Sequence, residues 1–132
     1  MYILDENIPE SQRLLLRSWR IHIGQIGQEI GWRGMKDEEI IPLLHKSHNT
    51  TFFTRDIGFY RSKCCHSDYC LVVLDVGQYE VASFIRRFLK HPEFNTRAKR
   101  MGNVVLVTHT GLQVLQHHVA KEEKITWTTK LF

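Results

Sequence analysis

Short apolar runs alternate with helical patterns along this chain, and this alternation is the feature that most restricts its fold. The runs are short enough to be strands, and patterns typical of helices lie between most of them. The strand-like runs are residues 2–4, 21–23, 51–54, 70–74 and 104–108. Such an alternation predicts an α/β fold, a sandwich in which helices pack on a mostly parallel central sheet.

Three segments carry the patterns typical of helices. Pro9 suits the first turn of a helix over residues 9–19, since the φ angle of proline is already helical. Asp37 is a favourable N-cap for a second helix over residues 37–48, and acidic residues follow it where the helix dipole favours negative charge. Apolar residues at helical spacing predict a third helix over residues 79–90.

The remaining segments have weaker patterns. Residues 61–69 are predicted as a loop, and residues 91–102 as a loop or a frayed helix end. A short element of undetermined type follows Gly111, and residues 124–132 are either an extra strand or a docking tail.

The length of 132 residues predicts one domain that spans residues 1–132. No apolar run approaches the ~20 residues of a membrane span, and the N-terminus lacks a basic region followed by an apolar stretch. The three cysteines fall within one short segment, which makes a poor disulfide framework and indicates a reducing compartment. We therefore expect a soluble cytoplasmic protein without a membrane partner.

Polar side chains follow three of the predicted strands at the points where these strands end. They are Asp5 and Asn7 after the first strand, Asp56 after the third and Asp75 after the fourth. Carboxyl ends of parallel strands meet at one edge of a sheet, where α/β proteins bind ligands at the switch point of strand order. The start of the second helix should bring Asp37 to the same edge.

Each of these aspartates also has a local explanation, as a helix cap, a turn former or a loop residue. Taken together they favour a shared role, because converging carboxylates repel one another unless a cation neutralises them. Oxygen ligands of this kind suit Mg²⁺ or Mn²⁺, which keep bound waters and bind substrate phosphates.

Positive charge is concentrated in a later part of the chain, although the net charge is only +4. Six basic residues against one acid lie between residues 86 and 100, namely Arg86, Arg87, Lys90, Arg97, Lys99 and Arg100. Phe94 lies among them and is a candidate for stacking on a base. The stretch is therefore a candidate RNA-binding surface, and docking of an acidic protein or of a second copy of the chain is the competing use.

The segment "KCCHSDYC" supplies Cys64, Cys65, His66 and Cys70, which are all chemically able to bind zinc. Structural zinc sites usually draw paired ligands from two separate clusters, and no second cluster follows here. A loop with semi-buried thiols is the favoured interpretation of this segment.

The segments "ILDENIP", "GMKDEEIIPLLHKSHNTTFFTRDIGF" and "VVLVT" together resemble the small PIN-like proteins related to VapC-type toxin nucleases. The typical run in that family is Asp-x-Asn after the first strand, an acidic helix start as in "DEEI", an apolar strand and then "TRD". The resemblance covers residues 2–60 with specific motifs and the remainder only in pattern. It implies a PIN-like three-layer sandwich.

The resemblance also implies roles for individual residues. Asp5, Asp37 and Asp56 match the metal-binding and catalytic aspartates, and Asn7 and Thr54 match supporting polar groups. Glu38 and Asp75 are further candidate metal ligands. The implied activity is that of a Mg²⁺- or Mn²⁺-dependent endoribonuclease, often a toxin that a small antitoxin protein neutralises.

Two alternatives remain open from the sequence. One is a catalytically silent PIN-like module that binds RNA or a protein through the basic residues, and the other is a phosphate-handling α/β enzyme such as a phosphatase. The partners expected for the leading hypothesis are an RNA substrate, a cognate antitoxin and a second copy of the chain in a homodimer.

Overall fold

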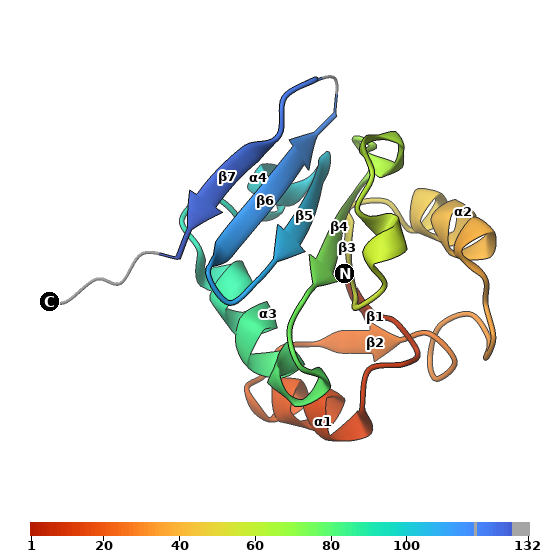
Figure 1. Ribbon diagram of the computed structural model, residues 1–132. Coiled ribbons are helices and arrows are strands. Elements are labelled where there is room, and N and C mark those ends of the chain that lie inside the picture. Colours follow the sequence, from red (N-terminus) through yellow and green to blue (C-terminus); the bar gives the residue numbers. More distant parts are fainter. Residues whose placement is uncertain (118, 128–132) are drawn as a thin grey trace, which may run out of the picture.

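Seven strands form one continuous sheet in the order β2-β1-β3-β4-β5-β6-β7 (Figure 1). The computed structural model of the chain describes residues 1–117 and 119–127. The strands are β1 (Tyr2–Leu4), β2 (Ile23–Gln25), β3 (Thr50–Thr54), β4 (Tyr69–Leu74), β5 (Asn103–Val107), β6 (Gly111–Gln116) and β7 (Glu123–Thr126). The strands of this sheet are thus distributed along most of the described chain.

The sheet is mostly parallel. Strands β1 to β5 pair in parallel, whereas β5, β6 and β7 pair antiparallel. Every residue of β3, β4 and β5 is buried, which is the pattern of strands covered on both faces. The prediction of an α/β fold with a mostly parallel central sheet is confirmed at this level.

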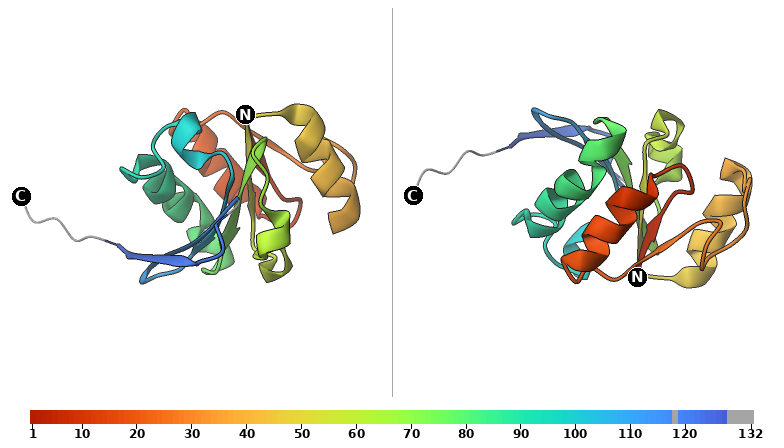
Figure 2. Two further views of the ribbon diagram at one scale, coloured as in Figure 1. Left: turned by 90° about the horizontal axis from the view of Figure 1, so that it is seen from above. Right: turned by 90° about the horizontal axis from the view of Figure 1, so that it is seen from below.

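Helices cover both faces of the sheet (Figure 2). Helices α1 (Glu10–Ser18) and α3 (Val81–Lys90) lie on one face, and α2 (Asp37–Ser47) lies on the other together with the 3₁₀ turns η1 (Ile57–Phe59) and η2 (Ser62–Cys64). A third 3₁₀ turn, η3 (Gln78–Glu80), precedes α3, and a short helix, α4 (Arg97–Arg100), precedes β5.

Two apolar clusters hold these layers together. Successive strand residues point to opposite faces, so Leu4 and Phe53 join the cluster under α1 and α3, while Ile3 and Phe52 join the cluster under α2. Leu44 anchors α2 in the second cluster and is fully buried.

The second strand begins later than predicted, at Ile23 instead of Ile21. The reason is the way α1 ends. Arg20 adopts a left-handed backbone conformation with φ of 63°, and the N–H of Ile21 donates to the carbonyl of Leu16. This is the hydrogen-bond pattern of a Schellman motif, and it uses Ile21 to terminate the helix before the strand starts.

The weakly patterned segments are also resolved into elements. The element after Gly111 is strand β6, and residues 123–126 of the C-terminal segment form strand β7 beside it. Residues 128–132, part of the predicted strand or docking tail, lie outside the described residues. In the described part of the chain, no helix is long and apolar enough to cross a membrane.

Candidate metal centre

The order of the strands reverses at β1, which lies between β2 and β3. In an open α/β sheet, the crevice outside the carboxyl ends of strands at such a switch point is the usual place for a ligand. Asp5 follows β1, Asp56 follows β3, and Asp37 begins α2. All three line one cavity of about 310 Å³, which we call the acidic pocket; its other lining residues are Glu6, Asn7, Ile8, Met35, Ile40 and Arg55.

Asp5 is held by hydrogen bonds on both carboxylate oxygens. Its backbone N–H donates to the carbonyl of Phe53 at 2.9 Å, which prolongs the pairing of β1 with β3. The Thr54 hydroxyl donates to Oδ2 at 2.6 Å, and the N–H of Glu6 donates to Oδ1 at 2.8 Å. Burial nevertheless raises the pKa of Asp5, and the charges of Asp56 and Glu6 raise it further.

Thr54 connects two of the aspartates. Its side chain is fully buried, and its Oγ1 also accepts a hydrogen bond from the N–H of Asp56 at 3.0 Å. One hydroxyl therefore fixes the Asp5 carboxylate relative to the turn that carries Asp56. This contact fits the supporting role that the resemblance implies for Thr54.

Asp56 and Asp37 complete the acidic side of the pocket. Oδ1 of Asp56 accepts a hydrogen bond from the N–H of Gly58 at 2.9 Å, which caps η1. A Cβ atom at position 58 would lie 3.0 Å from the same oxygen, so a glycine leaves this carboxylate undisturbed. Burial raises the pKa of Asp37, and so do the charges of Asp56 and Asp5 and a side-chain hydrogen bond with Asp56.

Asp37 is not the N-cap that the sequence predicts. Lys36 takes the cap position and Asp37 is the first helical residue. The Glu39 side chain accepts a hydrogen bond from the N–H of Lys36 at 3.0 Å and so fastens the start of α2. The carboxylate of Asp37 is consequently left to face the other aspartates of the pocket.

No basic side chain forms an ion pair with Asp5, Asp37 or Asp56 within residues 1–117 and 119–127. The Nε of Arg55 donates to the carbonyl of Val76 at 3.0 Å, which anchors that side chain on the pocket wall. With four acidic side chains against this one arginine, the pocket has an excess of negative charge, and its possible metal-ligand atoms are oxygens. This donor set fits a hard divalent cation such as Mg²⁺ or Mn²⁺.

The three carboxylates do not form a closed cage. In the described part of the chain, the group of three possible ligands whose atoms all lie within 4.8 Å of one another consists of His45, His66 and Asp68. The wider spacing of the pocket aspartates is compatible with Mg²⁺, which is usually bound through one or two carboxylates and keeps several waters.

The other predicted site residues, Asn7, Glu38 and Asp75, lie in three different surroundings. Asn7 lines the acidic pocket with an exposed side chain. Glu38 lies in a neighbouring cavity together with Asp37, Arg61 and Lys63, and its charge contributes to the raised pKa of Asp37. Asp75 is exposed and is absent from the lining of the acidic pocket, since it ends β4, one strand farther from the switch point.

Glu6 is a pocket residue that the sequence interpretation passed over. Its Oε1 accepts a hydrogen bond from the N–H of Gly34 at 2.8 Å and so ties the glycine-containing loop before α2 to the pocket. Gly34 has a φ of 80°, a conformation that suits glycine. The only signal for Glu6 in the sequence is its position between Asp5 and Asn7.

The predicted RNA-binding residues do not form one uniform surface. Arg97 is exposed, and Lys99 is exposed but donates to the carbonyl of Pro92 at 2.7 Å. Arg100 is only 6% exposed, because its guanidinium donates to the Phe94 carbonyl and the Tyr2 hydroxyl inside the fold. Arg100 therefore belongs to the interior of the protein and not to the basic surface.

Arg86 and Arg87 lie over aromatic rings. The guanidinium carbon of Arg86 is 3.7 Å from the centre of the Trp19 ring, and that of Arg87 is 4.2 Å from the centre of the Trp127 ring. Phe94, the predicted stacking residue, is buried and stacks on Phe88 instead.

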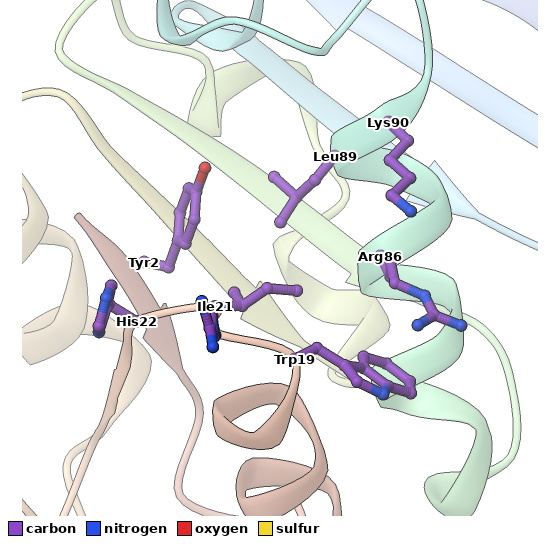
Figure 3. Close-up of a pocket in the computed structure, with 8 residues that line it drawn as sticks. Tyr2, Trp19, Ile21, His22, Arg86, Leu89 and Lys90 are labelled. Carbon is purple, nitrogen blue, oxygen red and sulfur yellow. The ribbon is translucent and has the colours of Figure 1, made fainter.

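Arg86 also lines a cavity of about 570 Å³ between the end of α1 and the last turns of α3 (Figure 3). Its wall combines basic and apolar side chains, namely Tyr2, Trp19, Arg20, Ile21, His22, Arg86, Leu89 and Lys90. We call it the basic groove. It lies by the start of β1, whereas the acidic pocket lies beyond the end of that strand.

Among the described residues, the cysteines do not belong to the group of side chains that could hold a metal ion. Cys64, Cys65 and Cys70 are free thiols, and two of them are buried. Burial raises the pKa of Cys65 and Cys70, which makes these thiols less ready to ionise and bind a metal. His66 approaches His45 and Asp68 instead.

The chain matches no model of a known protein family, no curated protein and no solved structure.

Proposed function

We propose that the acidic pocket binds Mg²⁺ or Mn²⁺ and that the chain is a metal-dependent endoribonuclease of PIN-like fold. The observation that carries the proposal is the meeting of Asp5, Asp37 and Asp56 at the switch point of the sheet without a basic partner among the described residues. The raised pKa values of Asp5 and Asp37 reflect burial and mutual repulsion, and a cation would relieve the repulsion.

Five side chains in and beside the pocket have a defined part in this proposal. Asp5, Asp37 and Asp56 hold the ion, and Thr54 keeps Asp5 oriented through its 2.6 Å hydrogen bond. Arg55, anchored by the Val76 carbonyl, provides positive charge on the pocket wall for a phosphate. When bound, the ion supplies a water of lowered pKa and offsets negative charge on the phosphodiester.

The residues of the basic groove are the argument for RNA as the substrate. Arg20, Arg86 and Lys90 carry positive charge suited to phosphates, and none of the described residues that line the groove is acidic. Trp19 is partly exposed beside them, with the Arg86 guanidinium over its ring. This same groove favours the second candidate function, a catalytically silent PIN-like module that binds RNA.

The experiment that separates the two functions is cleavage of a fluorescently labelled RNA by the purified chain with Mn²⁺, Mg²⁺ or a chelator. The metal-dependent enzyme should cleave only with the ion, and Asp56→Asn should reduce the rate at least about 100-fold, since it removes a metal-binding charge. Asp75→Asn is the matched control, because this strand-end aspartate lies outside the pocket lining, and its rate should stay near that of the wild type.

Cleavage that is unchanged in Asp56→Asn would point to a contaminating ribonuclease and contradict the assignment. Salt-sensitive RNA binding without any cleavage would favour the silent module.

The role of a toxin neutralised by a small antitoxin protein, and dimerisation of the chain, extend this proposal. They rest on the resemblance of "ILDENIP" and "FFTRD" to VapC-type nucleases. Induced expression should then arrest growth of the host cell, and Asp56→Asn should abolish the arrest while the protein accumulates to the same level.

A further inference from the structure

A second group of metal-ligating side chains lies at the other end of α2 from the acidic pocket. Ligand atoms of His45, His66 and Asp68 all lie within 4.8 Å of one another. We call these residues the histidine cluster. His45 belongs to the last turns of α2, and the other two precede β4. We infer that the histidine cluster binds a transition-metal ion of the Zn²⁺ type, independently of the proposed activity of the acidic pocket.

The donor types select the class of ion. Two imidazoles and one carboxylate suit Zn²⁺ and related ions, whereas Mg²⁺ prefers a set made of oxygens. Zinc lies about 2.0–2.2 Å from such ligands, so tetrahedral ligand atoms are roughly 3.4 Å apart. Partly exposed side chains at the surface can close from 4.8 Å to this spacing by small rotations.

A fourth ligand lies within reach. His48 follows the last residue of α2, and its Nδ1 is 3.6 Å from Oδ2 of Asp68. The Nδ1 of His66 lies at the same distance from that oxygen. Three imidazoles therefore lie around the Asp68 carboxylate, and together with it they supply the four donors that zinc usually takes.

The cluster is short of permanent positive charge. No lysine or arginine pairs with Asp68 in the part of the chain that the structure describes, and its ionic contacts there are with His48 and His66. Neutral imidazoles offer lone pairs and no charge. A divalent ion would supply a positive partner for the Asp68 carboxylate and would bind the imidazole lone pairs at the same time.

The rings are held in place before any ion arrives. His66 stacks on Tyr69, and His45 meets both rings edge to face, with centroids 4.3 Å from His66 and 5.1 Å from Tyr69. The N–H of Asp68 donates to Nδ1 of His66 at 3.1 Å, and binding through that nitrogen exchanges this hydrogen bond for the ion. Preorganisation of this kind lowers the entropy lost on binding.

The backbone around the cluster is also fixed. The N–H of Asn49 donates to the carbonyl of Asp68 at 2.6 Å and joins the end of α2 to the segment before β4. His48 and Asn49 both have positive φ, of 42° and 55°, which turns the chain sharply from α2 into β3. A bound ion would fasten the same two segments through their side chains and stabilise the fold.

The test is titration of the full chain, freed of metal by a chelator and dialysis, with Zn²⁺. Thermal unfolding should shift upward, and Co²⁺ in place of Zn²⁺ should give visible absorption bands typical of nitrogen and oxygen ligands. Asp68→Asn and His66→Gln should each weaken Zn²⁺ binding by more than about tenfold, since each removes a ligand. Both are close in shape to the native residues, and His45→Gln provides a third variant should either fail to fold.

Two control variants exclude other ligands for the ion. His22→Gln removes an exposed histidine of the basic groove, and Cys65→Ser removes the most exposed thiol of its segment. Both should keep the Zn²⁺ affinity of the wild type. Unchanged binding in Asp68→Asn and His66→Gln, or loss of binding in Cys65→Ser, would overturn the proposal.

Discussion

The two ends of α2 differ in the donors that they gather. At the N-terminal end, Asp37 lines the acidic pocket together with the carboxylates of Asp5 and Asp56. At the C-terminal end, His45 meets His66 and Asp68 in a mainly imidazole cluster. The helix dipole favours Asp37 at its position and would favour a cation at the other end. One helix can therefore serve two sites that select different ions, because the class of ion depends on the donor atoms.

The two sites also differ in how they are held together. Asp5 and Asp56 are fixed by the Thr54 hydroxyl, which is buried between paired strands. The histidine cluster depends on ring packing at the surface and on one backbone hydrogen bond. The carboxylates of the acidic pocket are consequently held more firmly than the side chains of the histidine cluster. Ion binding should therefore change the side-chain positions of the histidine cluster more.

The largest effect should come from a substitution in α2, the helix that contributes a ligand to each site. Leu44→Ala leaves a cavity where a fully buried side chain anchors α2, and it should lower the free energy of unfolding by about 3 kcal/mol. Because α2 carries a ligand of each site, binding of both Mn²⁺ and Zn²⁺ should weaken. Urea denaturation and metal titration measure the two effects. Leu14→Ala, at a position 53% exposed on α1, is the control and should change neither.

An effect confined to one site should follow from Thr54→Val. The substitution keeps the shape of the side chain but removes the donor to Asp5 and the acceptor for the Asp56 N–H. Loss of a buried hydrogen bond to a charged group should lower the free energy of unfolding by about 2 kcal/mol. Mn²⁺ affinity should fall and Zn²⁺ affinity should persist. Thr54→Ser retains the hydroxyl and should bind Mn²⁺ like the wild type. Wild-type Mn²⁺ affinity in Thr54→Val would show that the hydroxyl is dispensable.

The smallest effect concerns the charge of Asp37. A carboxyl whose pKa is raised by folding stabilises the protein fully below its unfolded pKa and loses this contribution as the pH rises through the folded pKa. Asp37→Asn does not titrate, so its stability relative to the wild type should increase between about pH 3.5 and pH 7 without metal. The gain should stay below about 1 kcal/mol, since Asp37 is partly exposed.

Thermal unfolding of both chains across this pH range measures the difference. A relative stability that decreased with pH would mean that folding lowers the pKa of Asp37, against the effects of burial and of the neighbouring carboxylates.

The sequence predicted those parts of the fold that depend on local patterns. Strands β3, β4 and β5 lie within one residue of their expected bounds, because short runs of apolar and β-branched residues ended by polar residues indicate strands. Strand β2 begins two residues later than predicted, because Arg20, a residue other than glycine, ends α1 in a left-handed conformation. Nothing in the local sequence marks that turn.

The candidate sites divide in the same way. Asp5 and Asp56 were predictable as pocket residues, since each follows a strand that the sequence identifies. The buried position of Arg100 was not predictable, because it depends on the Tyr2 hydroxyl, 98 residues away in the chain. The histidine cluster was also missed. Its members come from two segments, with His45 near the end of α2 and His66 and Asp68 before β4, and tertiary contacts such as the one between Asn49 and Asp68 bring these segments together.

The hydrogen bond between Thr54 and Asp5 has a further consequence for the order of folding. It joins residues 49 positions apart, so the acidic pocket cannot form before β3 has paired with β1. Contacts of such long sequence separation are slow to form, because closure of the intervening loop costs entropy. An ion for this pocket thus finds its complete site only in the nearly native chain. Its binding free energy should mainly slow unfolding and do little to speed folding.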